Sequence, residues 1–134
     1  MSRVLVDANV LLDVLTNDAH WYAWSAGQLD ACAGQGELAI NPVIYAEVSV
    51  GFERIEQLDE ALPPDVFLRQ PLPWEAGFLA GKAFVHCRRA KGARTSPPPD
   101  LYIGAHAAIE DMALLTRYAK RYRTYYPKLR LICP

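Results

Sequence analysis

A chain of 134 residues, 51% hydrophobic and with a net charge of −1, has the size and composition of one globular domain that folds without disulfides or a structural metal. Its three cysteines are too few and too scattered for a disulfide framework or a CxxC metal site. No apolar run approaches the roughly 18 residues of a transmembrane helix, and acidic residues break the N-terminal apolar run too early for a signal peptide. We expect one domain over residues 1–134, in the reducing cytoplasm and away from membranes.

The small net charge hides a division along the chain. Residues 1–75 carry 12 acidic and 3 basic side chains, whereas residues 76–134 carry 11 basic and 3 acidic ones. Such a division is typical of a protein that places a basic face for nucleic acid beside acids that hold a cation. The alternative is that the two halves interleave in the fold and their charges pair.

Short apolar runs alternate with helical patterns in chain order. The first run, 3–6, lacks polar alternation, which is typical of a strand buried on both faces. Gly34 and Gly36 are expected to end a helix, and Asn41-Pro42 to begin the next, with Asn41 as its N-cap. The predicted strands are 3–6, 38–40, 114–116 and 129–132, with 66–68 as a brief strand or an extended link. The predicted helices run from 10 to about 18, over 20–33, from 41–42 through 47, from about 53 to 62, over 74–91 and from 100 to about 111, with a loop over 92–99.

This order predicts an α/β fold with a short, mostly parallel central sheet flanked by helices on both faces, in three α/β/α layers. In such sheets, ligands bind outside the carboxyl ends of the strands. Asp7 directly follows the first strand, Asn41 follows the second and Tyr118 comes just after the third. We therefore expect a functional site at that edge of the sheet.

Three carboxylates are candidates for this site. Asp7 ends the first strand, Glu47 lies in a largely apolar turn of helix, and Asp100 begins a helix after three prolines. Asp7 and Asp100 could instead be plain helix N-caps, and Glu47 could lie on a solvated face. Gly104 follows Asp100 by four residues on the same helix face, where a small residue lets the helix approach another backbone closely.

Four segments resemble, in order, the sequence blocks of PIN-domain nucleases. They are Val4–Asp13 (VLVDANVLLD), Asn41–Val48 (NPVIYAEV), Asp100–Ala107 (DLYIGAHA), and Leu114–Arg117 followed by Arg121–Pro127 (LLTR and RYRTYYP). Each block is weak alone, but together they span nearly the whole chain. Their style and the chain length resemble the VapC toxins of toxin–antitoxin pairs. The resemblance implies a PIN-like fold, an endoribonuclease acting on RNA, a cognate antitoxin protein and a homodimer.

The resemblance also implies a metal site. Asp7, Glu47 and Asp100 are expected to hold Mg²⁺ or Mn²⁺, hard cations that prefer oxygen ligands. The expected reaction is hydrolysis of an RNA phosphodiester by metal-activated water. Asn9 is assigned to support the ligands or to contact substrate, and Thr116 to supply a hydroxyl or an ordered water.

One position departs from the family pattern. Tyr118 stands where the family often has Asp and sometimes Asn. A phenol with a pKa of about 10 is a poor ligand for Mg²⁺. The departure leaves open whether a second metal binds and whether the protein is fully active.

Basic residues flank the predicted site in sequence, and Lys and Arg contacts with phosphate supply affinity without reading bases. We assign as substrate contacts Arg88, Arg89, Arg94, Arg117, Lys120 and Arg121. The three histidines are expected on the surface or in packing, and Trp21, Trp24 and Trp74 in the core or at an interface.

Two other functions remain open. A PIN-like module could bind RNA or a partner without cutting it, and the neutral Tyr118 is the feature that favours this. A phosphatase-like hydrolase could use Asp7 as a nucleophile toward a small phosphate ester, although the second acid of such enzymes is Asn9 here. Metal-dependent RNA cleavage that is abolished in Asp7→Asn, or a covalent aspartyl-phosphate on Asp7, would separate these possibilities.

Overall fold

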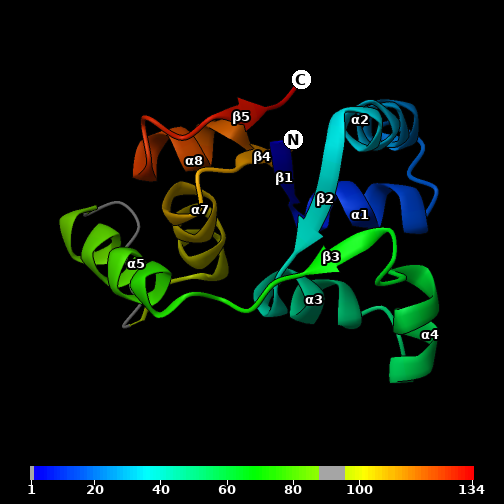
Figure 1. Ribbon diagram of the computed structural model, residues 1–134, viewed down its shortest axis with the longest axis horizontal. Helices are drawn as coiled ribbons and strands as arrows, with labels where there is room; N and C mark the ends of the chain where they lie inside the picture. The colour runs from blue at the N-terminus through cyan, green and yellow to red at the C-terminus, as the bar shows by residue number, and fades with distance from the viewer. Residues whose placement is uncertain (1, 88–95) are drawn as a thin grey trace.

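A parallel sheet forms the centre of the molecule (Figure 1) in the computed structural model, which describes residues 2–87 and 96–134. Its strand order is β3-β2-β1-β4-β5, and all four pairings are parallel. The strands are β1 (Ser2–Val6), β2 (Gly36–Ile40), β3 (Phe67–Arg69), β4 (Ala113–Leu115) and β5 (Leu131–Ile132). The predicted α/β/α architecture is confirmed.

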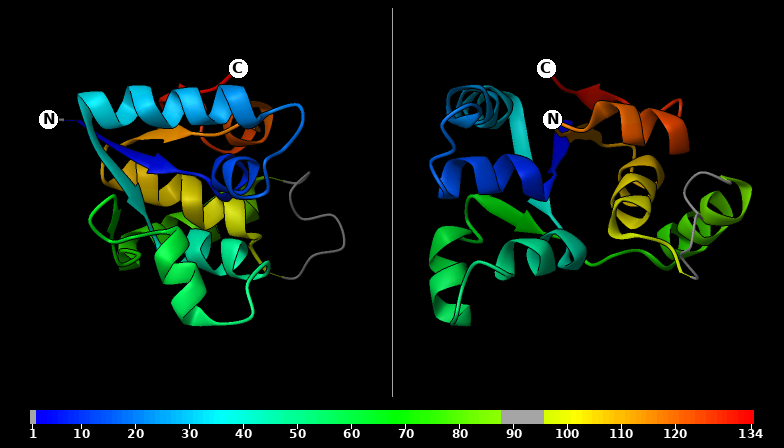
Figure 2. Two further views of the ribbon diagram at one scale, coloured as in Figure 1. Left: turned by 90° about the vertical axis from the view of Figure 1, so that its right-hand side faces the viewer. Right: turned by 180° about the vertical axis from the view of Figure 1, so that it is seen from behind.

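Seven helices of the described residues flank this sheet. They are α1 (Ala8–Leu15), α2 (Tyr22–Gln35), α3 (Pro42–Ser49), α4 (Ile55–Ala61), α5 (Trp74–His86), α7 (Pro99–Ile109) and α8 (Ala119–Tyr125). Figure 1 and Figure 2 show α1 and α2 on one side of the sheet and α5 and α7 on the other. The two layers bury the sheet on both faces, as a parallel sheet requires.

The core is centred on β1. Leu5 pairs in register with Ala39 of β2 and with Leu114 of β4, and all three residues are fully buried. A second hydrophobic cluster lies between α5 and α7, where Ala76 and Ala105 are fully buried. Alanines at this contact let the two helix axes approach closely, so that α7 is held between the sheet and α5.

The end of α2 differs from the prediction. The helix continues through Gly34 to Gln35, and the chain enters β2 directly at Gly36. Gly36 is extended, with φ of −178°, so it is not the left-handed residue that often ends a helix. A Cβ on Gly36 would overlap the backbone carbonyl of Ser2, so the glycine permits the close approach of β1 and β2.

Two other helices differ from the prediction. α5 ends at His86, because Cys87 is extended, with φ of −98° and ψ of 95°. The rest of the predicted helix over 74–91 lies outside the described residues. α8 has no predicted counterpart, because only Tyr122 of its seven residues is buried and no hydrophobic periodicity marks it.

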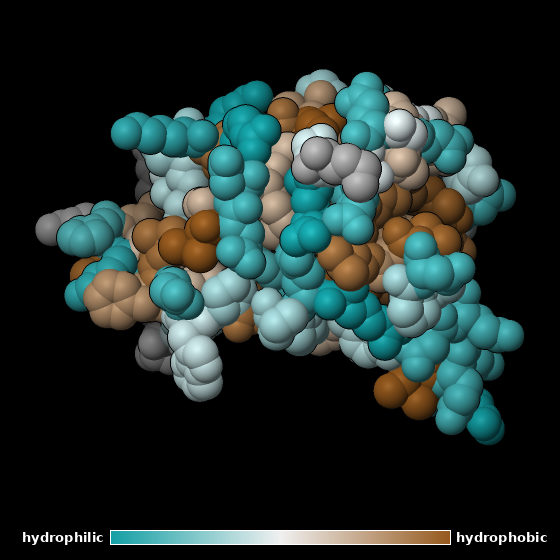
Figure 3. Space-filling view, viewed as in Figure 1, coloured by the Kyte–Doolittle hydropathy of each residue, from teal (hydrophilic) through white to brown (hydrophobic). Residues whose placement is uncertain are grey.

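Hydrophobic residues reach the surface in separate places. On the face shown in Figure 3 they gather over α5 at the left and on the right-hand side, with smaller groups at the top and over α4 at the lower right. Trp74 on α5 is 93% exposed, which excludes the core from its predicted place in the core or at an interface, whereas Trp24 packs against the main core. Across the described ranges, no helix is both long and apolar enough to cross a membrane.

Candidate active site at the carboxyl ends of the strands

Asp7 is the most highly connected carboxylate of the site. It follows β1, caps the N-terminus of α1 and is only 4% exposed. Its Oδ1 accepts a hydrogen bond from the Ala8 N–H at 2.8 Å. Its Oδ2 accepts from the Thr116 hydroxyl at 2.8 Å, the Tyr122 hydroxyl at 2.8 Å and the Asn9 amide at 3.0 Å. Asp7 therefore caps a helix and also accepts the hydrogen bonds that connect the polar residues of the site. The N-cap interpretation and the functional-site interpretation of Asp7 are compatible.

Burial dominates the electrostatics around Asp7. It raises the pKa of Asp7 above its usual value, although the hydrogen bonds from Thr116 and Tyr122 oppose the rise. Burial also raises the pKa of Tyr122, and the negative charge of Asp7 raises it further. Tyr122 therefore remains a protonated donor that orients the Asp7 carboxylate.

Glu47 reaches the same site from α3. Asn41 begins that helix at the end of β2, where its Oδ1 accepts from the Ile44 N–H at 2.9 Å, as expected of an N-cap. Burial raises the pKa of Glu47 to about 7, with further contributions from the charges of Asp7 and Asp100. The carboxylates therefore repel one another without a cation between them.

Asp100 lies in the first turn of α7. Pro98 is the N-cap and Pro99 the first helical residue, so the interpretation of Asp100 as the helix cap is wrong. The Asp100 side chain is 14% exposed, and its Oδ2 lies 3.2 Å from Nε of Arg121. This ion pair connects the acidic site to α8.

Gly104 sets how closely α7 packs against the tyrosines. A Cβ on Gly104 would lie 2.6 Å from the ring of Tyr126 and 3.1 Å from that of Tyr122. The close approach predicted for this glycine therefore occurs, but to aromatic rings and not to another backbone. It places Tyr122 against α7 and within reach of Asp7.

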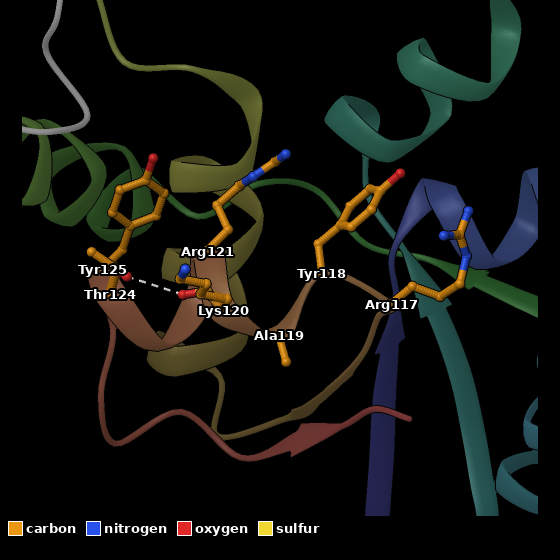
Figure 4. Close-up of a pocket in the computed structure, with 7 residues that line it drawn as sticks. All are labelled: Arg117, Tyr118, Ala119, Lys120, Arg121, Thr124 and Tyr125. Atoms are coloured by element: carbon orange, nitrogen blue, oxygen red, sulfur yellow. Dashed lines mark hydrogen bonds between the residues drawn. The ribbon is translucent and has the colours of Figure 1, made fainter.

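The carboxylates of Asp7, Glu47 and Asp100 line one pocket of about 570 Å³ together with Asn9 and Tyr118. A neighbouring hollow of about 520 Å³ is lined by Arg117, Lys120, Thr124 and Tyr125. Tyr118 and Arg121 line both, and Figure 4 shows their side chains at the second hollow. An acidic pocket thus opens next to a basic surface.

The donor set of the acidic pocket fits a divalent metal. Its three carboxylates supply the oxygen ligands that Mg²⁺ and Mn²⁺ prefer, and a cation would offset the burial and the mutual repulsion that raise the pKa values of Asp7 and Glu47. Among residues 2–87 and 96–134, no group of three or more His, Cys, Asp or Glu side chains already stands at coordinating distance. An ion held by all three carboxylates would require them to move closer together than they stand in this structure.

Arg117 is held by a buried acid that the sequence patterns did not single out. Its Nε and Nη2 donate to the two oxygens of Asp13 at 2.7 and 3.0 Å, and Asp13 also accepts from the Ser25 hydroxyl at 2.7 Å. Asp13 is 3% exposed. The Arg117 guanidinium also lies 4.9 Å from the centre of the Trp21 ring. Arg117 therefore connects the end of β4 with α1 and the start of α2. Lys120 and Arg121, by contrast, are exposed on α8.

The structure brings together Asp7, Asn9, Glu47, Asp100 and Thr116, five residues predicted for the site. Thr116 is fully buried, and its hydroxyl connects to the pocket through hydrogen bonds with the Asp7 carboxylate, the Asn9 amide and the Tyr118 N–H. Tyr122 was missed, because only its place in the fourth block marked it. The predicted substrate contacts Arg88, Arg89 and Arg94 lie outside the described residues.

Comparisons with known proteins agree on the fold. Residues 4–124 match the family model described as PIN domain. VapBC2 from Rickettsia felis, bound to a DNA fragment from its promoter, is 20% identical with a TM-score of 0.73 over 98% of both chains. VapBC-1 from nontypeable Haemophilus influenzae is 18% identical with a TM-score of 0.72, over 98% of this chain and 97% of that one. A toxin–antitoxin complex from Klebsiella pneumoniae is 19% identical with a TM-score of 0.65, over 96% and 95%. No curated protein sequence matches.

Proposed function

The chain belongs to the PIN domain family, and on that premise we propose that it is a metal-dependent endoribonuclease, the toxin of a toxin–antitoxin pair. One observation carries the proposal. Asp7, Glu47 and Asp100 come from three separate elements and line one pocket at the carboxyl end of the sheet. Three carboxylates that line one pocket from separate elements suit a metal that would activate water and stabilise charge on a phosphate.

The proposal assigns roles to five polar residues in and around the pocket. Asp7, Glu47 and Asp100 would hold Mg²⁺ or Mn²⁺, and the bound ion would supply a lowered pKa for water and polarisation of the phosphoryl oxygen. Thr116 and Tyr122 orient the Asp7 carboxylate through their hydrogen bonds of 2.8 Å.

The basic surface next to the pocket binds the RNA backbone. Lys120 and Arg121 are exposed there and contact the phosphates of the RNA. The Arg117 guanidinium is engaged by Asp13, so this residue contributes chiefly by positioning its segment. Asn9 fixes the same segment, since its Oδ1 accepts from the Arg117 N–H at 3.0 Å.

The proposed partners are an antitoxin protein and a second copy of this chain. One solved structure with the same fold is a toxin–antitoxin complex, which supports the first. A basic antitoxin side chain would complement the acidic pocket and occupy the place of the metal. Light scattering of the isolated protein tests the second, and a monomer at high micromolar concentration would refute the homodimer.

Cleavage by the purified full-length chain tests the activity. With Mg²⁺ or Mn²⁺ we expect cleavage of a mixed RNA preparation, and none in excess chelator. Asp7→Asn, Glu47→Gln and Asp100→Asn should each lower the rate at least about 100-fold, the scale expected when an electrostatic group of a reaction centre is removed. Asp111→Asn is the matched control, because the Asp111 side chain is 94% exposed and lies outside the pocket.

The outcomes separate the alternatives. Normal cleavage by all three variants in saturating Mg²⁺ would show that the site is misassigned. RNA binding without cleavage by the unmodified chain would favour the binding-module alternative, and a covalent aspartyl-phosphate on Asp7 would favour a phosphatase-like enzyme.

A further inference from the structure

We propose that the ring of Tyr118 is a stacking platform for an unpaired nucleobase next to the scissile phosphate. The inference rests on the proposed ribonuclease function and adds a substrate class to it, namely RNA whose base at this position is free to leave its own stack. Three features of Tyr118 lead to it: its position between two surfaces, the rigidity of its backbone and the two arginines beside its ring.

Tyr118 occupies the boundary between the acidic pocket and the basic hollow. It lines both, and it is 43% exposed although it lies only three residues after the fully buried end of β4 at Leu115. Its ring thus lies between the proposed metal ligands and the proposed phosphate contacts. A nucleotide whose phosphate reaches the carboxylates has its base in this region.

The backbone of Tyr118 is tied to the reaction centre. Its N–H donates to Oγ1 of Thr116 at 3.1 Å, and the Thr116 hydroxyl donates to Asp7 at 2.8 Å. Two hydrogen bonds therefore separate the Tyr118 backbone from the most highly connected carboxylate. A ring anchored in this way holds a base at a set place relative to the scissile phosphate, which a ring on a loose loop could not do.

Two guanidinium groups flank the ring. The Cζ atoms of Arg117 and Arg121 lie 5.2 and 5.0 Å from its centroid, and in Figure 4 the ring stands between the two side chains. The Arg117 side chain is 16% exposed and held in place by its ion pair with Asp13, so it supports the Tyr118 ring from one side. Arg121 is 51% exposed, and within the described residues its guanidinium forms one ion pair, with Asp100, so this side of the ring can admit a base.

These features suit a base better than a metal or a phosphate. A protonated phenol is a poor ligand for Mg²⁺, and its single hydroxyl offers a phosphate far less than the neighbouring arginines do. An exposed aromatic ring beside guanidinium groups is, by contrast, the common surface on which single-stranded nucleic acids stack their bases. Paired bases cannot reach such a ring, which is why the inferred substrate is unpaired here.

A double-mutant cycle between protein and RNA tests the inference. The full-length chain is titrated in excess chelator, so that no cleavage occurs, with a short single-stranded RNA and with copies that carry one abasic site at each position in turn. The protein variants are Tyr118→Leu, which removes the ring, and Tyr118→Trp, which keeps an aromatic face. Phe78→Leu is the matched control, because Phe78 is 70% exposed with a lysine above its ring at 5.2 Å but lines neither pocket.

We expect one abasic position to weaken binding to the unmodified chain about tenfold, and Tyr118→Leu to weaken binding to the intact RNA by a similar factor. The two effects should not add, because both remove the same interaction. Tyr118→Trp and Phe78→Leu should bind as the unmodified chain does, and a fully paired duplex should bind more weakly than the single strand.

Three results would overturn the inference, and they are distinguishable. If Tyr118→Leu binds RNA normally while the Lys120→Gln, Arg121→Gln double variant binds it weakly, the chain binds RNA but the Tyr118 ring does not stack on a base. The ring would then be available to contact a protein partner. If the unmodified chain binds no RNA at low salt, both the stacking role and the proposed function fail. Additive effects would also exclude a direct interaction between the ring and the missing base.

Discussion

Replacement of Glu47 by Gln provides a quantitative test of the charge crowding in the acidic pocket. Burial and two neighbouring carboxylates raise the pKa of Glu47 from its ordinary value of 4.5 to about 7. The folded protein therefore binds an extra proton between these values, and its free energy of unfolding falls as pH rises through that window. Above pH 7 the penalty is complete, and below about pH 4.5 it is absent.

The magnitude follows from the size of the pKa change. A rise of about 2.5 corresponds to at most about 3.4 kcal/mol at about 1.36 kcal/mol per pKa unit. Because Glu47 is only half-buried, solvent screening reduces this to about 1 to 2 kcal/mol. Glu47→Gln should therefore stabilise the metal-free protein by about 1 to 2 kcal/mol at pH 8 and change little at pH 4.

Denaturant unfolding in excess chelator at the two pH values measures this difference, with Glu60→Gln, an exposed glutamate on α4, as the control. Saturating Mg²⁺ should reverse the order at pH 8, because the unmodified chain gains a ligand that the variant lacks. An equal gain in stability at pH 4 and pH 8 would mean that packing, not charge, explains the effect. A decrease in stability at pH 8 without metal would refute the crowding itself.

Three further predictions concern other parts of the site. Gly104→Ala should destabilise the protein by about 1 to 3 kcal/mol in a thermal or denaturant melt, because its Cβ would lie 2.6 Å from a tyrosine ring. Gly77→Ala on α5 is the control for this variant. A Cβ at Gly77 would have no neighbouring atom within 4 Å, so this substitution should instead stabilise the protein by up to about 1 kcal/mol. The double variant Lys120→Gln, Arg121→Gln should reduce the slope of log RNA-binding constant against log salt concentration by about one unit for each phosphate contact that is removed. An unchanged slope would show that both side chains are solvated surface charges. Tyr118→Asp should tighten Mn²⁺ binding in calorimetry and lower metal-free stability, and two equally tight ions in the unmodified chain would show that a ligand has been missed.

The fold class could be predicted from local patterns, and the three carboxylates could be selected once the four blocks were seen to resemble those of PIN-domain nucleases. An apolar run without polar alternation marks a strand buried on both faces, and β1 is such a strand. Parallel strands bring their carboxyl ends to one edge, so acids that follow or lie near these ends meet in one pocket, as Asp7 and Glu47 do. The N-cap role of Asn41 also followed from its side chain and the proline after it.

Boundaries that depend on fit between elements could not be predicted in this way. Gly36 resembles a helix terminator in the sequence, but its missing side chain serves the contact with Ser2 in the neighbouring strand. α8 carries no hydrophobic periodicity, because a single buried tyrosine and the packing of the finished fold hold it in place.

The acids of the pocket could be predicted, but the residues that orient them could not, because their contacts also depend on how separate elements pack. An acid after a strand is visible within about ten residues of sequence. The bond from Tyr122 to Asp7 joins residues 115 apart, and that from Arg117 to Asp13 joins residues 104 apart. Neither partner has a local pattern that reveals the other, since only the packing of α8 and α1 around β4 and β1 brings them within hydrogen-bond distance. The sequence therefore determined which carboxylates the pocket contains, and the tertiary structure decided how they are held, because hydrogen-bond geometry depends on distances that exist only after the core has packed.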